Sequence, residues 1–107
     1  MSEFNKREEG FEKKFALDEE QKFKAEARRN KLLGLWAAEK LGITGDAASA
    51  YAKEVVAADF EEAGDNDVLH KVLKDLTAKG QAATERDIRA KMDELLAVAA
   101  AQVKAGS

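Results

Sequence analysis

The side chains best suited to bind a ligand are the basic ones around position 30. Arg28, Arg29 and Lys31 form the densest cationic cluster in the chain, and Trp36 follows Arg29 by seven residues. This spacing places Arg29 and Trp36 on nearly the same side of a helix. Guanidinium and ammonium groups bind phosphate, and an indole ring stacks on a base. Arg28, Arg29, Lys31 and Trp36 are therefore candidate nucleotide-binding residues, with a solvated basic face as the alternative interpretation.

Residue types that catalyse reactions or bind metals are scarce. The chain has no cysteine, and its one histidine, His70, has no second ligand type at a metal-binding spacing. The acidic run from Asp59 to Asp67 has a glycine at the sixth position of a calcium loop, but Ala63 and His70 occupy the fifth and twelfth positions. No Gly-x-x-x-x-Gly-Lys sequence is present. We predict no catalytic site, no metal site and no required cofactor.

The N-terminal segment has an unusual distribution of aromatic residues. Phe4, Phe11 and Phe15 are three of the five phenylalanines in the chain, and the residues between them are mostly charged. Spacings of seven and four place the three rings on one helical stripe. The stripe is sparser than the three apolar residues per two turns that a core helix requires. We predict that residues 1–17 form a flexible amphipathic arm that binds another molecule.

The charge distribution disfavours nucleic acids and membranes as partners. Positions 1–31 hold nine basic and eight acidic residues, and the whole chain has a net charge of −3. Neither the first part nor the remainder is the polycation that duplex DNA or RNA attracts. The acidic residues of the arm nearly match its basic ones, which disfavours an anionic lipid surface. Without a long apolar run or a signal sequence, we expect a chain that neither spans a membrane nor is secreted.

Capping signals divide the rest of the chain into four segments. The candidate N-caps are Asp18, Thr44, Asp65 and Thr84, and the candidate stops are Gly42, Gly64 and Gly80. Apolar residues with helical periodicity fill each segment, beginning with Phe23 in the first. We predict an all-α four-helix bundle over residues 18–107, with helices at about 18–41, 45–63, 66–79 and 85–104. Its bulky core residues are predicted to be Trp36, Tyr51 and Phe60.

Four blocks of the sequence carry a family resemblance. They are residues 4–15, 50–62 and 88–96, and the block 23–41, which reads Phe-Lys-Ala-Glu-Ala-Arg-Arg-Asn-Lys-Leu-Leu-Gly-Leu-Trp-Ala-Ala-Glu-Lys-Leu. Together they extend over nearly the whole chain, and they resemble, in the same order, the zeta subunit family of alphaproteobacterial F-type ATP synthases. The resemblance implies a four-helix bundle that acts as a natural inhibitor of ATP hydrolysis, with its inhibitory part at the N-terminus.

The resemblance also implies partners and a location. It implies a regulatory subunit, not an enzyme, that binds the catalytic head of ATP synthase in the cytoplasm, at the cytoplasmic face of the inner membrane. The arm would block hydrolysis by inserting into the head, through Phe4, Lys6, Arg7, Glu8, Phe11, Lys14 and Phe15. ADP or ATP would be a regulatory ligand on the bundle, at the candidate residues Arg28, Arg29, Lys31 and Trp36. The alternative is a small nucleotide-sensing helical module with a non-functional, frayed N-terminus.

Overall fold

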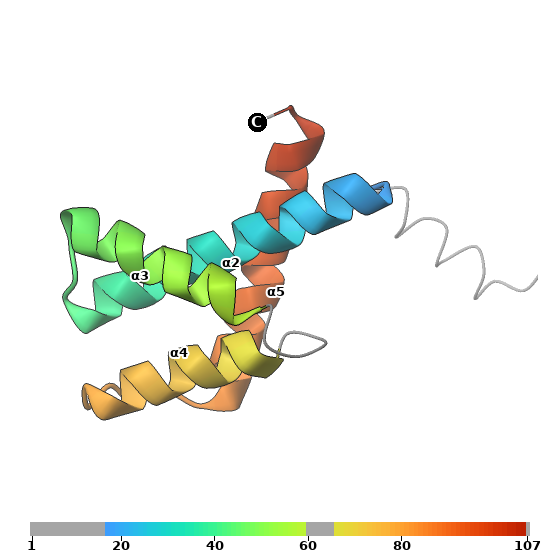
Figure 1. The fold of residues 1–107 in the computed structure, drawn as a ribbon. Helices are drawn as coiled ribbons and strands as arrows, with labels where there is room; N and C mark the ends of the chain where they lie inside the picture. The colour runs from blue at the N-terminus through green and yellow to red at the C-terminus, as the bar shows by residue number, and fades with distance from the viewer. Residues whose placement is uncertain (1–16, 60–65, 107) are drawn as a thin grey trace, which may run out of the picture.

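The computed structural model describes residues 17–59 and 66–106. These residues form four helices, labelled as in Figure 1: α2 (Glu19–Leu41), α3 (Gly45–Ala58), α4 (Asn66–Ala78) and α5 (Glu85–Lys104). For the described part of the chain, the predicted all-α four-helix fold is confirmed. Helix α3 ends at Ala58, earlier than the predicted end at residue 63, and residues 60–63 lie outside the described ranges.

Local sequence determines most of the helix ends. Asp18 and Thr84 each accept a hydrogen bond from the backbone N–H three residues on, and the side chain at that position bonds back to the cap, so both form capping boxes. Thr44 occupies the N-cap of α3, but its side chain makes no capping hydrogen bond. Gly42 ends α2 with a φ of 76°, a conformation that glycine adopts without steric cost. The predicted cap Asp65 lies outside the described residues.

Helix α2 packs against each of the other three helices. Helices α2 and α3 lie side by side as an antiparallel pair, α5 crosses α2 at a steep angle, and α4 packs against α3 and α5 (Figure 1). The α2 and α3 backbones approach closely at Gly34, where an added Cβ would lie 2.6 Å from the Cα of Ala52. Only a residue without a side chain fits this contact, so Gly34 sets the distance between the two helices.

The main core lies where the four helices meet. Its largest fully buried apolar side chains are Leu33, Val55, Val68, Val72, Leu76, Ile88 and Met92. Of the three predicted core aromatics, Tyr51 is buried, Trp36 is partly buried against this cluster, and Phe60 lies outside the described residues. The core is therefore mainly aliphatic.

A second, smaller cluster joins the first half of α2 to the second half of α5. It contains Ala25, Ala99 and Ala100, with Leu17, Leu32, Leu96 and Val103 packed around them. The prediction that Phe23 belongs to the apolar face of the first helix is wrong, because Phe23 is 61% exposed. The contact with α5 is made through Ala25, and two helical steps of about 100° turn Phe23 to the opposite side of α2.

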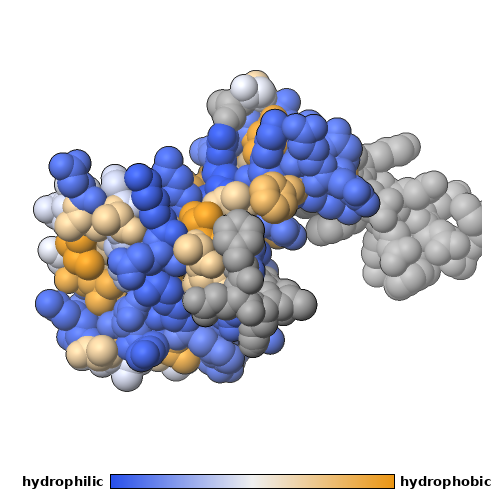
Figure 2. Space-filling view, viewed as in Figure 1, coloured by the Kyte–Doolittle hydropathy of each residue, from blue (hydrophilic) through white to orange (hydrophobic). Residues whose placement is uncertain are grey.

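The surface of the helices is mostly polar. Figure 2 shows a mainly hydrophilic face on which hydrophobic residues form small, separate patches. Among the described residues, the large apolar side chains that are exposed are Phe23, Leu35 and Val98. No helix within the described ranges is long and apolar enough to cross a membrane.

Candidate binding site

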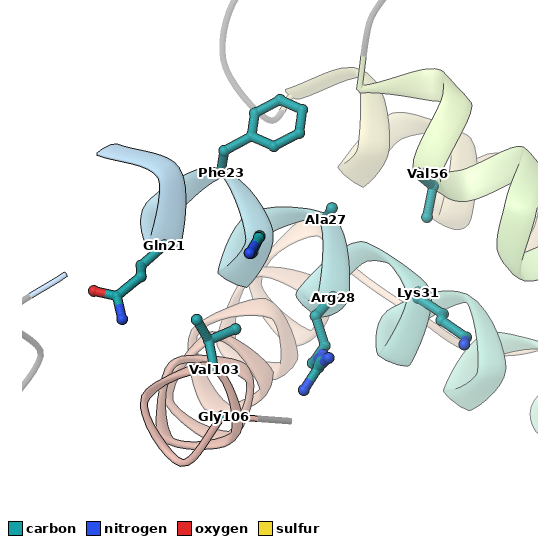
Figure 3. Close-up of a pocket in the computed structure, with 9 residues that line it drawn as sticks. Gln21, Phe23, Ala27, Arg28, Lys31, Val56, Val103 and Gly106 are labelled. Carbon is teal, nitrogen blue, oxygen red and sulfur yellow. The ribbon is translucent and has the colours of Figure 1, made fainter. Parts of the chain in front are cut away.

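An open groove of about 540 Å³ lies where the first half of α2 crosses the end of α5, with one residue of α3 at its edge. Three basic and three large apolar side chains line it: Lys24, Arg28 and Lys31, and Phe23, Val56 and Val103. Figure 3 shows Arg28 projecting from α2 toward the end of α5, where Val103 lies, and Phe23 projecting from α2 on the side away from Arg28. We call this feature the α2–α5 groove.

The charge of the α2–α5 groove is positive. Lys24, Arg28 and Lys31 are spaced by four and three residues, which places them on one face of α2. Among the described residues that line the groove, none has a carboxylate side chain. Lys24 pairs with Glu20 at 3.3 Å, but both side chains are exposed and such a pair contributes little stability. The Nη1 of Arg28 donates a hydrogen bond to Gln102 at 3.5 Å, which ties α2 to α5. The groove suits an anionic ligand that also has an apolar part.

The four predicted nucleotide-binding residues do not converge on one site. Arg28 and Lys31 share the groove. Arg29 is only 5% exposed, and its Nε donates a hydrogen bond to the Oδ1 of Asn30 at 3.0 Å. Asn30 is fully buried, and its Nδ2 has no hydrogen-bond partner within residues 17–59 and 66–106. Arg29 therefore belongs to the interior side of α2, whereas Arg28 and Lys31 face the groove.

Trp36 lies further along α2 and contacts a different set of residues. The Nζ atoms of Lys40 and Lys91 lie 5.2 Å and 5.6 Å from the centre of its ring. These are cation–π contacts, and the one from Lys91 joins α5 to α2. Lys91 also pairs with Glu94 at 2.6 Å. In this arrangement the indole is a partly buried packing residue beside the main core, and it is not a wall of the groove.

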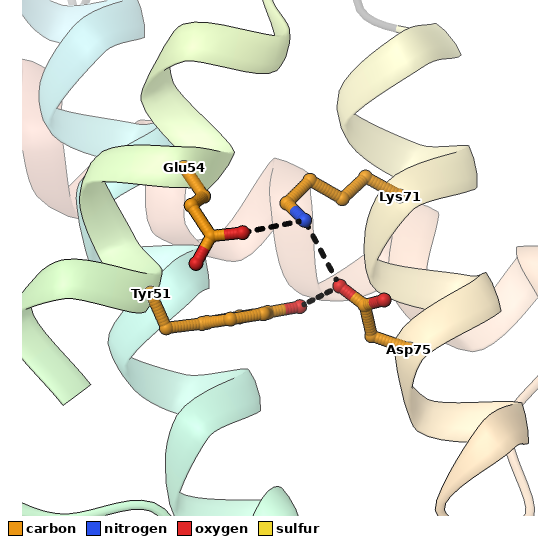
Figure 4. A network of polar contacts seen from close by, with 4 residues as sticks. All are labelled: Tyr51, Glu54, Lys71 and Asp75. Atoms are coloured by element: carbon orange, nitrogen blue, oxygen red, sulfur yellow. Dashed lines mark hydrogen bonds and ion pairs between the residues drawn. The ribbon is translucent and has the colours of Figure 1, made fainter. Parts of the chain in front are cut away.

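A polar network joins α3 to α4 (Figure 4). The hydroxyl of Tyr51 donates to the Oδ2 of Asp75 at 2.8 Å, and the Nζ of Lys71 donates to the same oxygen at 3.2 Å and to the Oε1 of Glu54 at 3.4 Å. Burial, the hydrogen bond to Asp75 and the negative charges of Asp75 and Glu54 all raise the pKa of Tyr51. Burial by itself would lower the pKa of Lys71, but its bonds to Asp75 and Glu54 outweigh this and raise it. Both pKa values are raised further above neutral pH, so neither group changes its charge there. The network therefore stabilises the packing of α3 on α4.

The remaining candidate residues offer no metal site. His70 is exposed, with its Nε2 3.5 Å from the Oε1 of Glu85. In the described part of the chain, no group of three or more histidine, aspartate or glutamate side chains is placed to hold a metal ion. The predicted arm contacts Phe4, Lys6, Arg7, Glu8, Phe11, Lys14 and Phe15 lie outside the described residues.

Of the six basic and large apolar side chains that line the groove, only Arg28 and Lys31 are among the residues predicted from the sequence. Lys24 could be predicted from the sequence, because its spacing places it on the same helical face as Arg28 and Lys31. The apolar contribution of Val56 and Val103 depends on how α3 and α5 cross α2, which no local pattern encodes. Phe23 belongs to the apolar pattern that predicts the first helix, and that pattern does not indicate a groove.

Comparison with known proteins agrees with these features. A family model for the ATPase inhibitor subunit zeta matches residues 1–102, and the chain belongs to this family. One solved structure, a solution NMR structure, shares 60% sequence identity with a TM-score of 0.69, over 79% of this chain and 96% of that chain. No curated protein matches the sequence.

Proposed function

We propose that this protein is a regulatory subunit that inhibits ATP hydrolysis by an F-type ATP synthase. The observation that carries the proposal is the match to the ATPase inhibitor subunit zeta family over residues 1–102. The matched span includes both the aromatic segment 1–17 and most of the four-helix region. Family membership supports a role exerted by binding to the synthase.

The proposed mechanism assigns the block to the N-terminal arm, residues 1–17. The arm inserts as a helix into a cleft of the catalytic head, with Phe4, Phe11 and Phe15 buried along one face. Each buried phenylalanine contributes roughly 1.5–3 kcal/mol. Ordering a segment of this length costs conformational entropy, so charged contacts must add to the rings. The residues assigned to these contacts are Lys6, Arg7, Glu8 and Lys14.

The experiment is a hydrolysis assay with purified synthase head and full-length protein. The variant Phe4→Ala, Phe11→Ala, Phe15→Ala removes the aromatic face, and Asn5→Ala, Glu9→Ala, Lys13→Ala changes three positions off that stripe as the matched control. We expect the first variant to lose inhibition at concentrations where the wild type inhibits fully, and the control to retain it. Full inhibition by the phenylalanine variant would exclude this mechanism.

A second part of the proposal concerns nucleotide. We propose that ADP or ATP binds in the α2–α5 groove, with its phosphates at Arg28 and Lys31 and its base against Phe23. The basic and apolar lining of the groove supports this assignment. Titration of ADP into isotope-labelled protein should shift the amides from Phe23 to Lys31, and shifts confined to α4 would reject it. ADP binding without any inhibition of hydrolysis would favour the nucleotide-sensing alternative.

A further inference from the structure

The three basic side chains of the α2–α5 groove lie along about two turns of α2. Lys24 and Lys31 are seven residues apart, which separates them by about 10 Å along the helix axis. A helix with acidic residues at matching spacing can engage all three cations at once. The groove also offers apolar surface along this length, from Phe23 at one end to Val56 and Val103.

We propose that the α2–α5 groove docks an acidic amphipathic helix on the surface of the ATP synthase, and so gives the bundle its own contact with the enzyme, separate from the arm. This inference rests on the proposed function, since the partner is the same enzyme. The choice of occupant rests on charge complementarity: the described residues that line the groove include three cations and no carboxylate. Amphipathic helices bind grooves of this kind by burying an apolar face between charged rims.

The exposed ring of Phe23 supplies the apolar part of the contact. At 61% exposed, it is the most exposed large apolar residue in the described part of the chain, and it lies next to Lys24 at the rim. A partner helix that covers this ring removes aromatic surface from water while its carboxylates meet the lysines. Arginine is among the residues that often dominate binding energy at interfaces, and phenylalanine is enriched at their cores, so Arg28 and Phe23 are the groove residues best suited to such a contact.

The position of the groove along the chain links it to the arm. Helix α2 begins at Glu19, directly after the arm, and Phe23 and Lys24 lie in its first turns. When the synthase binds the arm, the groove therefore lies next to the surface of the synthase around the arm's binding site. Two linked contacts raise the effective concentration of each for its site, so docking of the bundle strengthens binding of the arm.

Charge reversal tests the docking proposal. The variant Lys24→Glu, Lys31→Glu alters two groove cations and leaves Arg28 with its bond to Gln102. The matched control is Lys53→Glu, Lys79→Glu, at exposed positions outside the groove. Each double variant replaces two positive by two negative charges and takes the net charge from −3 to −7. Thermal melting of both verifies the fold.

The measurement is the midpoint of inhibition when full-length protein is titrated into synthase, repeated at two salt concentrations. We expect the groove variant to need at least about tenfold more protein and to show a weaker salt dependence, with full inhibition at saturation. The control should stay within about twofold of the wild type. The phenylalanine variant of the arm should instead bind without inhibiting, so failure of the arm mechanism and failure of groove docking give different results.

Two outcomes would overturn the proposal. One is a midpoint for the groove variant equal to that of the control. The other is a groove variant that loses only ADP binding and keeps its affinity for the synthase, which would make the groove a nucleotide site alone. A Phe23→Ser variant supplies an uncharged test, because an exposed ring can be removed without opening the core, and its affinity should fall while its melting temperature is unchanged.

Discussion

Replacement of Gly34 by alanine should destabilise the protein, although alanine is the better helix former. An added Cβ would lie 2.6 Å from the Cα of Ala52, 3.1 Å from its Cβ and 3.3 Å from the Cβ of Val55. The nearest atom belongs to the α3 backbone, which cannot rotate away as a side chain can. Helices α2 and α3 must therefore separate, and the main core between them must repack.

The expected magnitude is the difference of two effects. Forcing an extra carbon into a packed contact costs about 1–3 kcal/mol, and a backbone contact belongs at the upper end of that range. Alanine recovers about 1 kcal/mol of helix propensity relative to glycine. We therefore expect Gly34→Ala to lower the free energy of unfolding by about 2 kcal/mol, which corresponds to a melting temperature roughly 8–16 °C lower for a domain of this size.

Circular dichroism melting and urea titration measure this effect. Ala97→Gly, at an exposed position of α5, calibrates the propensity term alone and should cost about 1 kcal/mol. Adding Ala52→Gly to the Gly34→Ala variant should restore little, because the closest contact involves the Cα of residue 52. A Gly34→Ala variant that melts at a higher temperature than the wild type would refute the close approach of α2 and α3.

Three further predictions concern caps, pH and packing. Asp18→Ala should cost about 1 kcal/mol of stability in urea titration because it removes a capping box, whereas Thr44→Ala should cost clearly less, and equal costs would contradict the cap geometry. Since the pKa of Tyr51 is raised in the folded state, the unfolded tyrosine ionises first, and the free energy of unfolding should fall as pH rises above about 10. Tyr51→Phe should make the free energy of unfolding less dependent on pH in this range, and an unchanged dependence would argue against the bond to Asp75. Because Tyr51 is the only tyrosine, its absorbance titration measures the shift in its pKa directly. Phe23→Ala should leave the melting temperature within about 2 °C of the wild type, whereas Leu33→Ala should lower the free energy of unfolding by about 2–5 kcal/mol. Similar losses of stability in the two variants would show that Phe23 is packed and not exposed.

The helices were predictable because their ends are encoded locally. Asp18 and Thr84 cap their helices as predicted, and each forms a capping box with the residue three positions on. Thr44 has the right residue type at the right place, but its side chain takes no part in capping. The sequence signal identifies the position of a cap more reliably than its hydrogen bonds, since those depend on the rotamer that neighbouring residues allow.

The buried faces of the helices were harder to predict, because burial depends on how the helices pack across one another. Arg29 has the chemistry of a surface residue, yet it lies between Ala25 and Leu33 on a stripe with a spacing of four, and both of those residues are buried. That spacing was available in the sequence as a sign that Arg29 faces inward. The bond between Tyr51 and Asp75 joins positions 24 residues apart and had no local signal.

The alanine-rich cluster between α2 and α5 has a consequence for how the molecule unfolds. Ala25, Ala99 and Ala100 each bury little surface, and the larger residues packed around them are only partly buried. We therefore expect this cluster to open at a lower free energy than the main core. Amide hydrogens at the start of α2 and the end of α5 would then exchange with solvent through local unfolding. Those around Leu33 would exchange only when the whole domain unfolds. Mild heating would thus unfold the α2–α5 groove before the rest of the protein, and the start of α2, which follows the arm in the sequence, would unfold with it.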